Sequence, residues 1–522
     1  MSTRVVSSYS LSQYVTITIV EGIDGKMRYI VYEPVLNDLS KRILAESINR
    51  VYSDTKLLKS FSHASKANDF SYALSLARLV TENVAKSRLS AFKKMLKAPM
   101  HSGLITESEL SKVAYYIARD LAGYGPIDPL LRDPRIEDVT CNGVGIPIYV
   151  FHNEYEWLET NIAMPNEESM ERVIRKLSYR TGREPSVAQP IVEGVLNPEG
   201  YRVHIVLDTV SRRGHSFTIR KFREKPFTII ELINRGTIDP CVSALLWLAV
   251  DNKLGVIFYG PTGSGKTTLM NAISMLLPSE IKIVSVEDTP EVNLPFHDNW
   301  VPMTTRLSYD SAVQSVTLQV QVESALRQRP DVLILGEIRS REAYAFFQAV
   351  STGHGGLTTI HSESVESLIE RLIAPPMSVP KSLLPIAKLL VNVVRLATPK
   401  GVLRKVMYVH ELEGYSPATD SLTTKILVKW YREVDEWRIN VRNNSLFKAI
   451  AELNAVSYGD VVNELVRRAT VLAYAAKKEF DIASLHVLIR RYRREPEKVF
   501  EEAVEYLKKP YEVKELVEAG IA

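Results

Sequence analysis

The sequence predicts an α/β fold whose main domain has a largely parallel sheet, preceded by α+β structure and followed by a mostly helical extension. In the second half, continuously apolar runs at 255–259, 282–286 and 332–335 alternate with helical stretches. This pattern is typical of parallel strands that are covered on both faces. In the first half, short strand-like runs and helical segments come first, and after a helical pattern at 110–121, further strand-like runs surround another helical pattern at 167–181, which indicates α+β structure instead.

Length and composition narrow the class of protein. A chain of 522 residues has room for roughly three or four domains of about 150 residues, which excludes a single small binding module. With 45% apolar and 24% charged residues and a net charge of +4, the chain has an ordinary globular composition, and bulk charge indicates no partner. The two cysteines, Cys141 and Cys241, are too few for a disulfide scaffold or a four-cysteine zinc site.

The chain shows no pattern for export or membrane spanning. Its start has only Arg4 as an early charge, followed by a polar stretch, and so lacks the positively charged start and the long apolar core of a signal peptide. The most apolar windows, 243–250 and 383–394, are interrupted by Asp251 and Lys388 before they reach the roughly 20 residues of a spanning helix. We therefore expect a cytoplasmic protein whose membrane contact is peripheral.

Composition shifts and turn residues predict five segments. They are an N-terminal α+β domain (1–104), a second α+β domain (105–222), a linker (223–240), the α/β core (241–415) and a helical extension (416–522). Pro226, Gly236 and Pro240 mark the linker. The extension carries an apolar stripe at helical spacing, suited to packing against another body. Its members are Val462, Leu465, Val466, Ala469, Leu472, Ala473 and Ala476.

The strongest motif lies between an apolar strand at 256–259 and helix-forming residues at 268–277. It fits G-x-x-x-x-G-K-[ST], the phosphate loop of nucleotide-binding proteins. Its glycines let backbone N–H groups turn toward phosphate, Lys266 reaches the β- and γ-phosphates, and the Thr267 hydroxyl ligates Mg²⁺. A glycine-rich turn with a solvated lysine is the alternative. The predicted nucleotide-binding residues are Gly260, Pro261, Thr262, Gly263, Ser264, Gly265, Lys266, Thr267 and Thr268.

Two acids follow predicted parallel strands. Glu337 comes after 332–335 and Gly336, and Glu287 comes after 283–286. The carboxyl ends of such strands form the ligand crevice of open α/β sheets, where Glu337 can orient or deprotonate an attacking water. Gly336 stands where many nucleotide hydrolases have a metal-binding Asp. A magnesium ion would therefore rely on Thr267, phosphates and waters, with Glu287 or Glu337 contributing through water. For Glu287, a plain turn acid is the alternative.

Two histidines flank a glycine-rich turn and the strand at 357–360. An imidazole of His354 or His361 at this place can contact the γ-phosphate and respond to its loss. A structural role is the alternative, and for His354 the sequence favours neither. Zinc ligation is disfavoured because no cysteine lies in this region.

Four motif blocks in this order resemble the secretion ATPases of type II and type IV secretion, type IV pili and the archaellum. The blocks are the phosphate loop, the acidic box 286–291, the segment 326–339 and the histidine box 351–361. The resemblance covers about 255–413, and 124–127, 200–204 and 217–222 resemble the family's second N-terminal domain. The extension of roughly 100 residues and the residues of the motif blocks are more similar to those of archaeal members.

The resemblance implies a function and an architecture. It implies a RecA-like core, a PAS-like second N-terminal domain, and ATP bound between them with Mg²⁺. It further implies a homohexamer at the cytoplasmic face of a polytopic membrane platform protein, powering assembly of a pilus-like or archaellum filament. Glu287 and Glu337 are the implied catalytic acids. The implied charge-stabilising arginines are Arg202, Arg220 and Arg327, with Arg212, Arg213 and Arg306 as substitutes, and the sequence does not choose among them.

Two other functions remain open from the sequence. One is a nucleic-acid translocase or helicase on the same core, and the other is a scaffold that binds ATP with negligible turnover. The basic run 490–494 suggests nucleic acid or anionic lipid. A solvated helix face is favoured, because acidic residues follow at once, so no nucleic-acid partner is expected.

Overall fold

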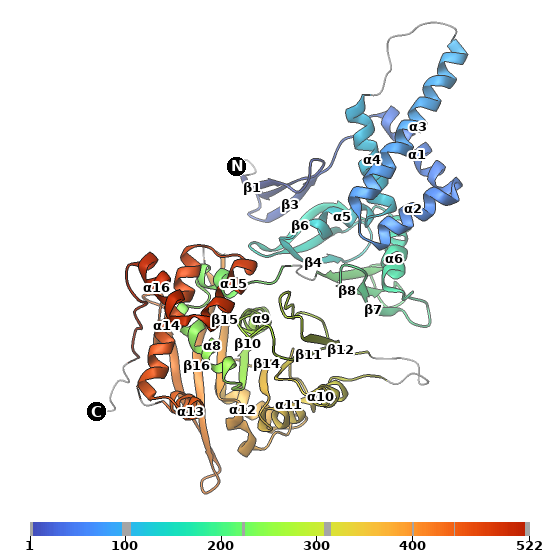
Figure 1. Cartoon of the computed structure of the whole chain (residues 1–522). Coiled ribbons are helices and arrows are strands. Elements are labelled where there is room, and N and C mark those ends of the chain that lie inside the picture. Colours follow the sequence, from blue (N-terminus) through green and yellow to red (C-terminus); the bar gives the residue numbers. More distant parts are fainter. Residues whose placement is uncertain are drawn as a thin grey trace. The chain divides into compact units, whose positions relative to one another are not determined.

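The computed structural model describes residues 4–96, 106–221, 225–306, 315–398, 401–442 and 444–516 (Figure 1). The chain divides into two compact units, Met1–Arg223 and Glu224–Ala522. The predicted boundary at 104/105 and the residues 222–224 lie outside the described residues. Among the described helices, none is both long and apolar enough to cross a membrane.

The described strands of the first unit form one sheet in the order β1-β2-β3-β6-β5-β4-β9-β8-β7. Neighbouring strands are antiparallel except β3 and β6, which pair in parallel. The strands are β1 (Arg4–Ser10), β2 (Thr16–Glu21), β3 (Met27–Tyr32), β4 (Ile136–Cys141), β5 (Pro147–His152), β6 (Glu156–Ala163), β7 (Ile191–Leu196), β8 (Tyr201–Val206) and β9 (Ser216–Arg220). The helices are α1 (Asp38–Ser53), α2 (Thr55–Lys66), α3 (Phe70–Leu96), α4 (Glu107–Leu121), η1 (Gly125–Ile127), α5 (Asp128–Arg132) and α6 (Glu167–Thr181).

The first unit combines the two N-terminal domains that the sequence suggested. Strands β1 to β3 come from the first predicted domain, and they extend the sheet of the second through the β3–β6 pairing. Helices α1 to α4 share one apolar core, in which Ile43, Phe61, Ala77 and Ile117 are buried together. Because both the sheet and this core cross the predicted boundary, the two segments form a single compact unit.

The second unit has a mixed sheet in the order β12-β11-β13-β14-β10-β15-β16-β17-β18 among the described strands. Pairing is parallel from β12 to β15 and antiparallel from β15 to β18, so the sheet is less uniformly parallel than expected. Short connections between β15 and β18 allow only antiparallel neighbours. The strands are β10 (Val256–Gly260), β11 (Ile283–Glu287), β12 (Trp300–Thr304), β13 (Val332–Leu335), β14 (Gly355–His361), β15 (Leu389–Thr398), β16 (Gly401–Ser416), β17 (Ser421–Tyr431) and β18 (Glu436–Ile439).

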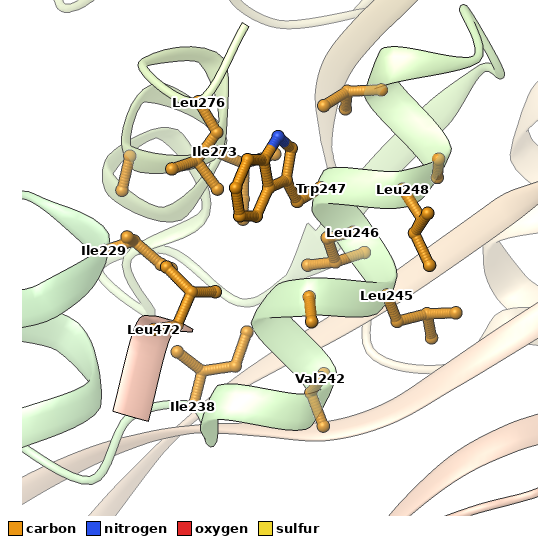
Figure 2. Packing of buried hydrophobic residues seen from close by; sticks show 14 of the residues in the cluster. Ile229, Ile238, Val242, Leu245, Leu246, Trp247, Leu248, Ile273, Leu276 and Leu472 are labelled. Carbon is orange, nitrogen blue, oxygen red and sulfur yellow. The ribbon is translucent and has the colours of Figure 1, made fainter. Parts of the chain in front are cut away.

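The described helices of the second unit are distributed along its sequence from Ile229 to Leu507. They are α7 (Ile229–Asn234), α8 (Pro240–Asp251), α9 (Lys266–Ser274), α10 (Leu318–Leu326), α11 (Glu342–Ser351), α12 (Val365–Ile373), η2 (Lys381–Ile386), α13 (Ser445–Asn454), α14 (Tyr458–Lys477), α15 (Ile482–Arg494) and α16 (Pro496–Leu507). Figure 2 shows Trp247 of α8 turned toward Ile273 and Leu276, with Leu472 of α14 beside Ile229 and Ile238. The apolar stripe on α14 therefore packs against α8 of its own unit.

The segment expected to be a linker is partly folded into this core. A capping box between Thr228 and Glu231 starts α7, and Ile229 and Ile230 are buried in the same cluster as Trp247. The second unit therefore begins close to Glu224 rather than at Cys241. The short amphipathic pattern at 229–233 was visible in the sequence, but its packing partner lies more than 200 residues away on α14.

Replacement of Leu472 tests whether α14 is a structural part of the second unit. Leu472 is fully buried, so Leu472→Ala removes apolar contacts and leaves a cavity. We expect the free energy of unfolding to fall by about 2–5 kcal/mol in denaturant titrations of the full chain. The control Val487→Ala, at an exposed site on α15, should change it by at most about 0.5 kcal/mol. Equal stability of both variants would contradict the packing of α14.

Candidate functional site

The carboxyl ends of the parallel strands meet at one edge of the second sheet. Gly260 at the end of β10 is in register with His361 at the end of β14. Glu287 ends β11, and Glu337 follows β13, the strand between β11 and β14. Parallel pairing therefore gathers residues that lie up to 101 positions apart in the sequence.

The phosphate loop connects β10 to α9 through backbone conformations that need glycine. Gly265 has φ +93° and immediately precedes α9. Gly260 has φ +153°, and a Cβ atom there would lie 2.0 Å from the carbonyl oxygen of Val393 on β15. Side chains are thus excluded at both ends of the loop, as the motif requires. Within it, the buried Ser264 hydroxyl has no hydrogen-bond partner among the described residues.

Lys266 is the first residue of a chain of contacts along this edge. Its Nζ donates to the carbonyls of Gly260 (3.1 Å) and Pro261 (2.9 Å) and lies 3.2 Å from His361 Nδ1. The His361 Nε2 atom is 3.3 Å from Glu337 Oε1. Since the ammonium can only donate, Nδ1 accepts, which leaves the proton of a neutral imidazole on Nε2, the nitrogen nearest to the carboxylate. The fold therefore brings Lys266, His361 and Glu337, three residues that the sequence analysis singled out, together at one edge of the sheet.

Burial sets the protonation of this contact chain. It lowers the pKa of the Lys266 ammonium to about 8, against the opposing effect of Glu337. Burial also lowers the pKa of His361, and the neighbouring Lys266 charge lowers it further. Both shifts follow from removing a cation from water. His361 is therefore neutral at physiological pH, in keeping with its role as an acceptor from Lys266.

Glu287 has a different environment from the one expected of a crevice acid. Its Oε1 accepts the backbone N–H groups of Glu291 and Val292, each at 3.0 Å. The carboxylate thus holds the turn of the acidic box, the alternative that the sequence left open. A Cβ atom at Gly336 would lie 3.0 Å from Cγ of Glu287, so little space remains for the Asp of many nucleotide hydrolases. Burial raises the pKa of Glu287 to about 7.

Two predicted residues lie at the opposite edge of the sheet. His354 precedes β14, and its Nδ1 is 3.0 Å from both Thr352 Oγ1 and the carbonyl of Ala349. The seven residues of β14 separate His354 from the loop edge by about 23 Å at 3.3 Å per residue. Arg327 caps the C-terminus of α10, ahead of the amino end of β13. Within the second unit, neither residue lies at the phosphate loop: His354 has the structural place that the sequence left open, and a part of Arg327 in catalysis stays a prediction.

The remaining predicted arginines are distributed over both units. Arg202 on β8 and Arg220 on β9 are directly opposite in register and exposed on the same face of the first sheet. Arg202 Nη2 also lies 3.2 Å from Glu193 Oε2. Arg212 and Arg213 lie in the connection between these strands, and Arg306 follows β12 in the second unit. Their part in catalysis stays a prediction.

Three further arginines contact the site, and the sequence assigned them no role. Arg404 on β16 donates from Nε to the carbonyl of Gly263 in the loop (3.0 Å), and Arg371 donates to the carbonyl of His361 (2.6 Å). Arg339 donates to Glu337 Oε2 (2.7 Å). Arg339 belongs to a motif block, so its nearness to Glu337 was a usable signal. No local pattern indicates Arg404, whose contact depends on the antiparallel half of the sheet.

Comparison with known proteins places this geometry in a family. The model of the family described as "Type II/IV secretion system protein" matches residues 165–405. An uncharacterised protein of Methanocaldococcus jannaschii is 34% identical over 478 residues, covering 89% of this chain and 85% of that protein. Type IV secretion system protein VirB11 of Brucella suis is 31% identical over 279 residues, covering 47% of this chain and 74% of that protein.

The chain belongs to the type II/IV secretion system protein family. Among solved structures, the VirB11 ATPase of the Brucella suis type IV secretion system, in complex with sulphate, is 26% identical with a TM-score of 0.28. That comparison covers 54% of this chain and 91% of the other. The family resemblance expected from the four motif blocks is thus confirmed.

Replacement of Glu287 tests whether burial raises the pKa of its carboxyl group in the folded chain. The unfolded carboxyl titrates near 4.5 and the folded one near 7, so the folded state binds the extra proton between these values and its stability falls as pH rises through them. Glu287→Gln keeps an acceptor without the charge. We expect this variant to be more stable than wild type by about 1–3 kcal/mol at pH 8 and nearly equal at pH 5.

The measurement is denaturant unfolding of both proteins at the two pH values. The exposed Glu363 offers a matched control, since Glu363→Gln should leave the pH dependence as in wild type. A Glu287→Gln variant with the wild-type dependence on pH would show that Glu287 is already ionised in the folded chain at pH 5.

Proposed function

We propose that this protein is a Mg²⁺-dependent ATPase that powers assembly of a type IV pilus-like or archaellum filament, or a related secretion process, at the cytoplasmic face of the membrane. The observation that carries the proposal is the contact chain from the phosphate-loop lysine through His361 to Glu337. Membership in a secretion-system family supports the coupling to transport or filament assembly.

Each residue of the edge has a chemical task in this proposal. Backbone N–H groups of the loop and of the first turn of α9 would bind the phosphate oxygens of ATP. Lys266 would exchange its bonds with the carbonyls of Gly260 and Pro261 for bonds with the β- and γ-phosphates. Glu337 would orient the attacking water and accept its proton. His361, bonded to Lys266 and next to Glu337, would respond when Lys266 moves.

Donors at the loop are compatible with a nucleotide and magnesium. The glycine positions leave the cradle clear of side chains, and Ser264 offers a buried hydroxyl that the described residues do not satisfy. Within the described ranges, no group of three His, Cys, Asp or Glu side chains suits a metal ion. Mg²⁺ would therefore be held by Thr267, in the first turn of α9, together with phosphate oxygens and water, and would neutralise phosphate charge.

Assembly and partners complete the proposal. The chain would act as a homohexamer on a polytopic membrane platform protein. Arg202 and Arg220 would supply positive charge to the reacting phosphate. No nucleic-acid partner is proposed. This is supported by two arginines of the basic run in α15, which pair with acidic residues of the same unit. Arg491 pairs with Glu502 (2.6 Å), and Arg493 pairs with Asp251 (2.6 Å) and donates to the carbonyl of Leu276.

Nucleotide binding is tested by Lys266→Ala. Removal of the ammonium deletes charge-assisted bonds to phosphate, so ATP affinity should fall by about 10- to 100-fold or more in a binding titration. Lys448→Ala, an exposed lysine on α13, is the control for loss of one positive charge and should bind as wild type does. Normal affinity of Lys266→Ala would reject the phosphate-loop assignment.

Hydrolysis is tested separately by Glu337→Gln. The amide keeps the size of the side chain but cannot accept a proton, so phosphate release should slow by about 10²- to 10⁴-fold while ATP binding is retained. Glu370→Gln on α12 serves as the control for an exposed acid. An unchanged rate in Glu337→Gln would remove this residue from its assigned task.

A further inference from the structure

We propose that Arg339 is a positioning residue that fixes the carboxylate of Glu337 for water activation, an inference that rests on the proposed ATPase function. The two residues are separated by one position, and Arg339 Nη2 lies 2.7 Å from Glu337 Oε2. The other carboxylate oxygen, Oε1, faces His361 Nε2 at 3.3 Å. Arg339 thus holds one carboxylate oxygen by a hydrogen bond, and His361 lies next to the other.

The backbone around Arg339 is held firmly enough to fix its neighbour. The carboxylate of Glu342, which is 5% exposed, accepts the N–H groups of Arg339 and Ser340, each at 2.6 Å. Ile338 N–H bonds to the carbonyl of Thr359 on β14 (2.9 Å), and the Thr359 hydroxyl donates to the carbonyl of Gly336 (2.8 Å). The segment that carries Arg339 is therefore anchored to both α11 and β14.

A second contact ties Arg339 to the acidic box. Its Nη1 lies 3.8 Å from Asp288 Oδ2, in the residue that follows β11. Arg339 thus faces one carboxylate from the β13 end and one from the β11 end. An exposed ion pair contributes little to stability. Its value here lies in orientation, because a general base loses efficiency when its carboxylate rotates away from the water that it must deprotonate.

The proposal predicts a change in turnover without a change in binding. Arg339→Ala should lower kcat by about 10- to 100-fold and leave ATP affinity within about 2-fold of wild type. Arg339→Lys keeps a cation within reach of Glu337 and should restore part of kcat. Arg341→Ala, an exposed arginine two positions further along, is the matched control and should keep wild-type turnover.

A double variant separates positioning from a general structural effect. If Arg339 acts through Glu337, Arg339→Ala should cost little further turnover in a Glu337→Gln background. Full multiplication of the two effects, an unchanged kcat or a raised kcat in Arg339→Ala would each overturn the role of Arg339. Those outcomes apply while wild type hydrolyses ATP. A wild-type chain that binds ATP without releasing phosphate would reject the ATPase function itself, and the role of Arg339 with it.

Discussion

Parallel pairing of β10, β14, β13 and β11 is the constraint on which the rest of the second unit depends. It sends the phosphate loop, His361, Glu337 and the acidic box to the same edge of the sheet. No single segment of the chain contains more than a part of this edge. The register between Gly260 and His361 sets which side chains meet, because a shift of one residue would turn His361 to the other face.

Sequence reasoning worked where a chemical residue closes a strand. Lys266 was predicted from the phosphate-loop motif, and His361 and Glu337 were predicted because each closely follows an apolar run whose carboxyl end faces the crevice. For His354 the sequence left a phosphate contact and a structural role open, and the same geometry favours the structural role, because His354 stands at the other end of β14 from His361. The contacts of Arg404 and α14 come from pairings far along the chain. No local pattern indicates the contact of Arg404 or the shared sheet of the first unit, and the apolar stripe of α14 predicts a packed face without indicating α8 as its partner.

Burial of charged side chains at this edge costs stability, although the same side chains serve the proposed chemistry. Lys266 and Glu287 are buried, and each is shifted toward its neutral form by the loss of water. Two backbone N–H groups partly compensate Glu287, and two carbonyls with His361 compensate Lys266. An anion in the loop would offset the cost of the buried ammonium.

The packing of α14 on α8 has a practical consequence for anyone who wishes to isolate the motif-bearing region. A fragment ending near Tyr415 would contain every motif block but would strip the cover from Trp247, Leu246 and their neighbours. It would also remove β17, the partner of β16, and so leave β16 as a long exposed edge strand. Exposed apolar surface and an exposed sheet edge of this kind favour aggregation over folding. A fragment of the second unit therefore has to include β17 and α14 as well as the motif blocks.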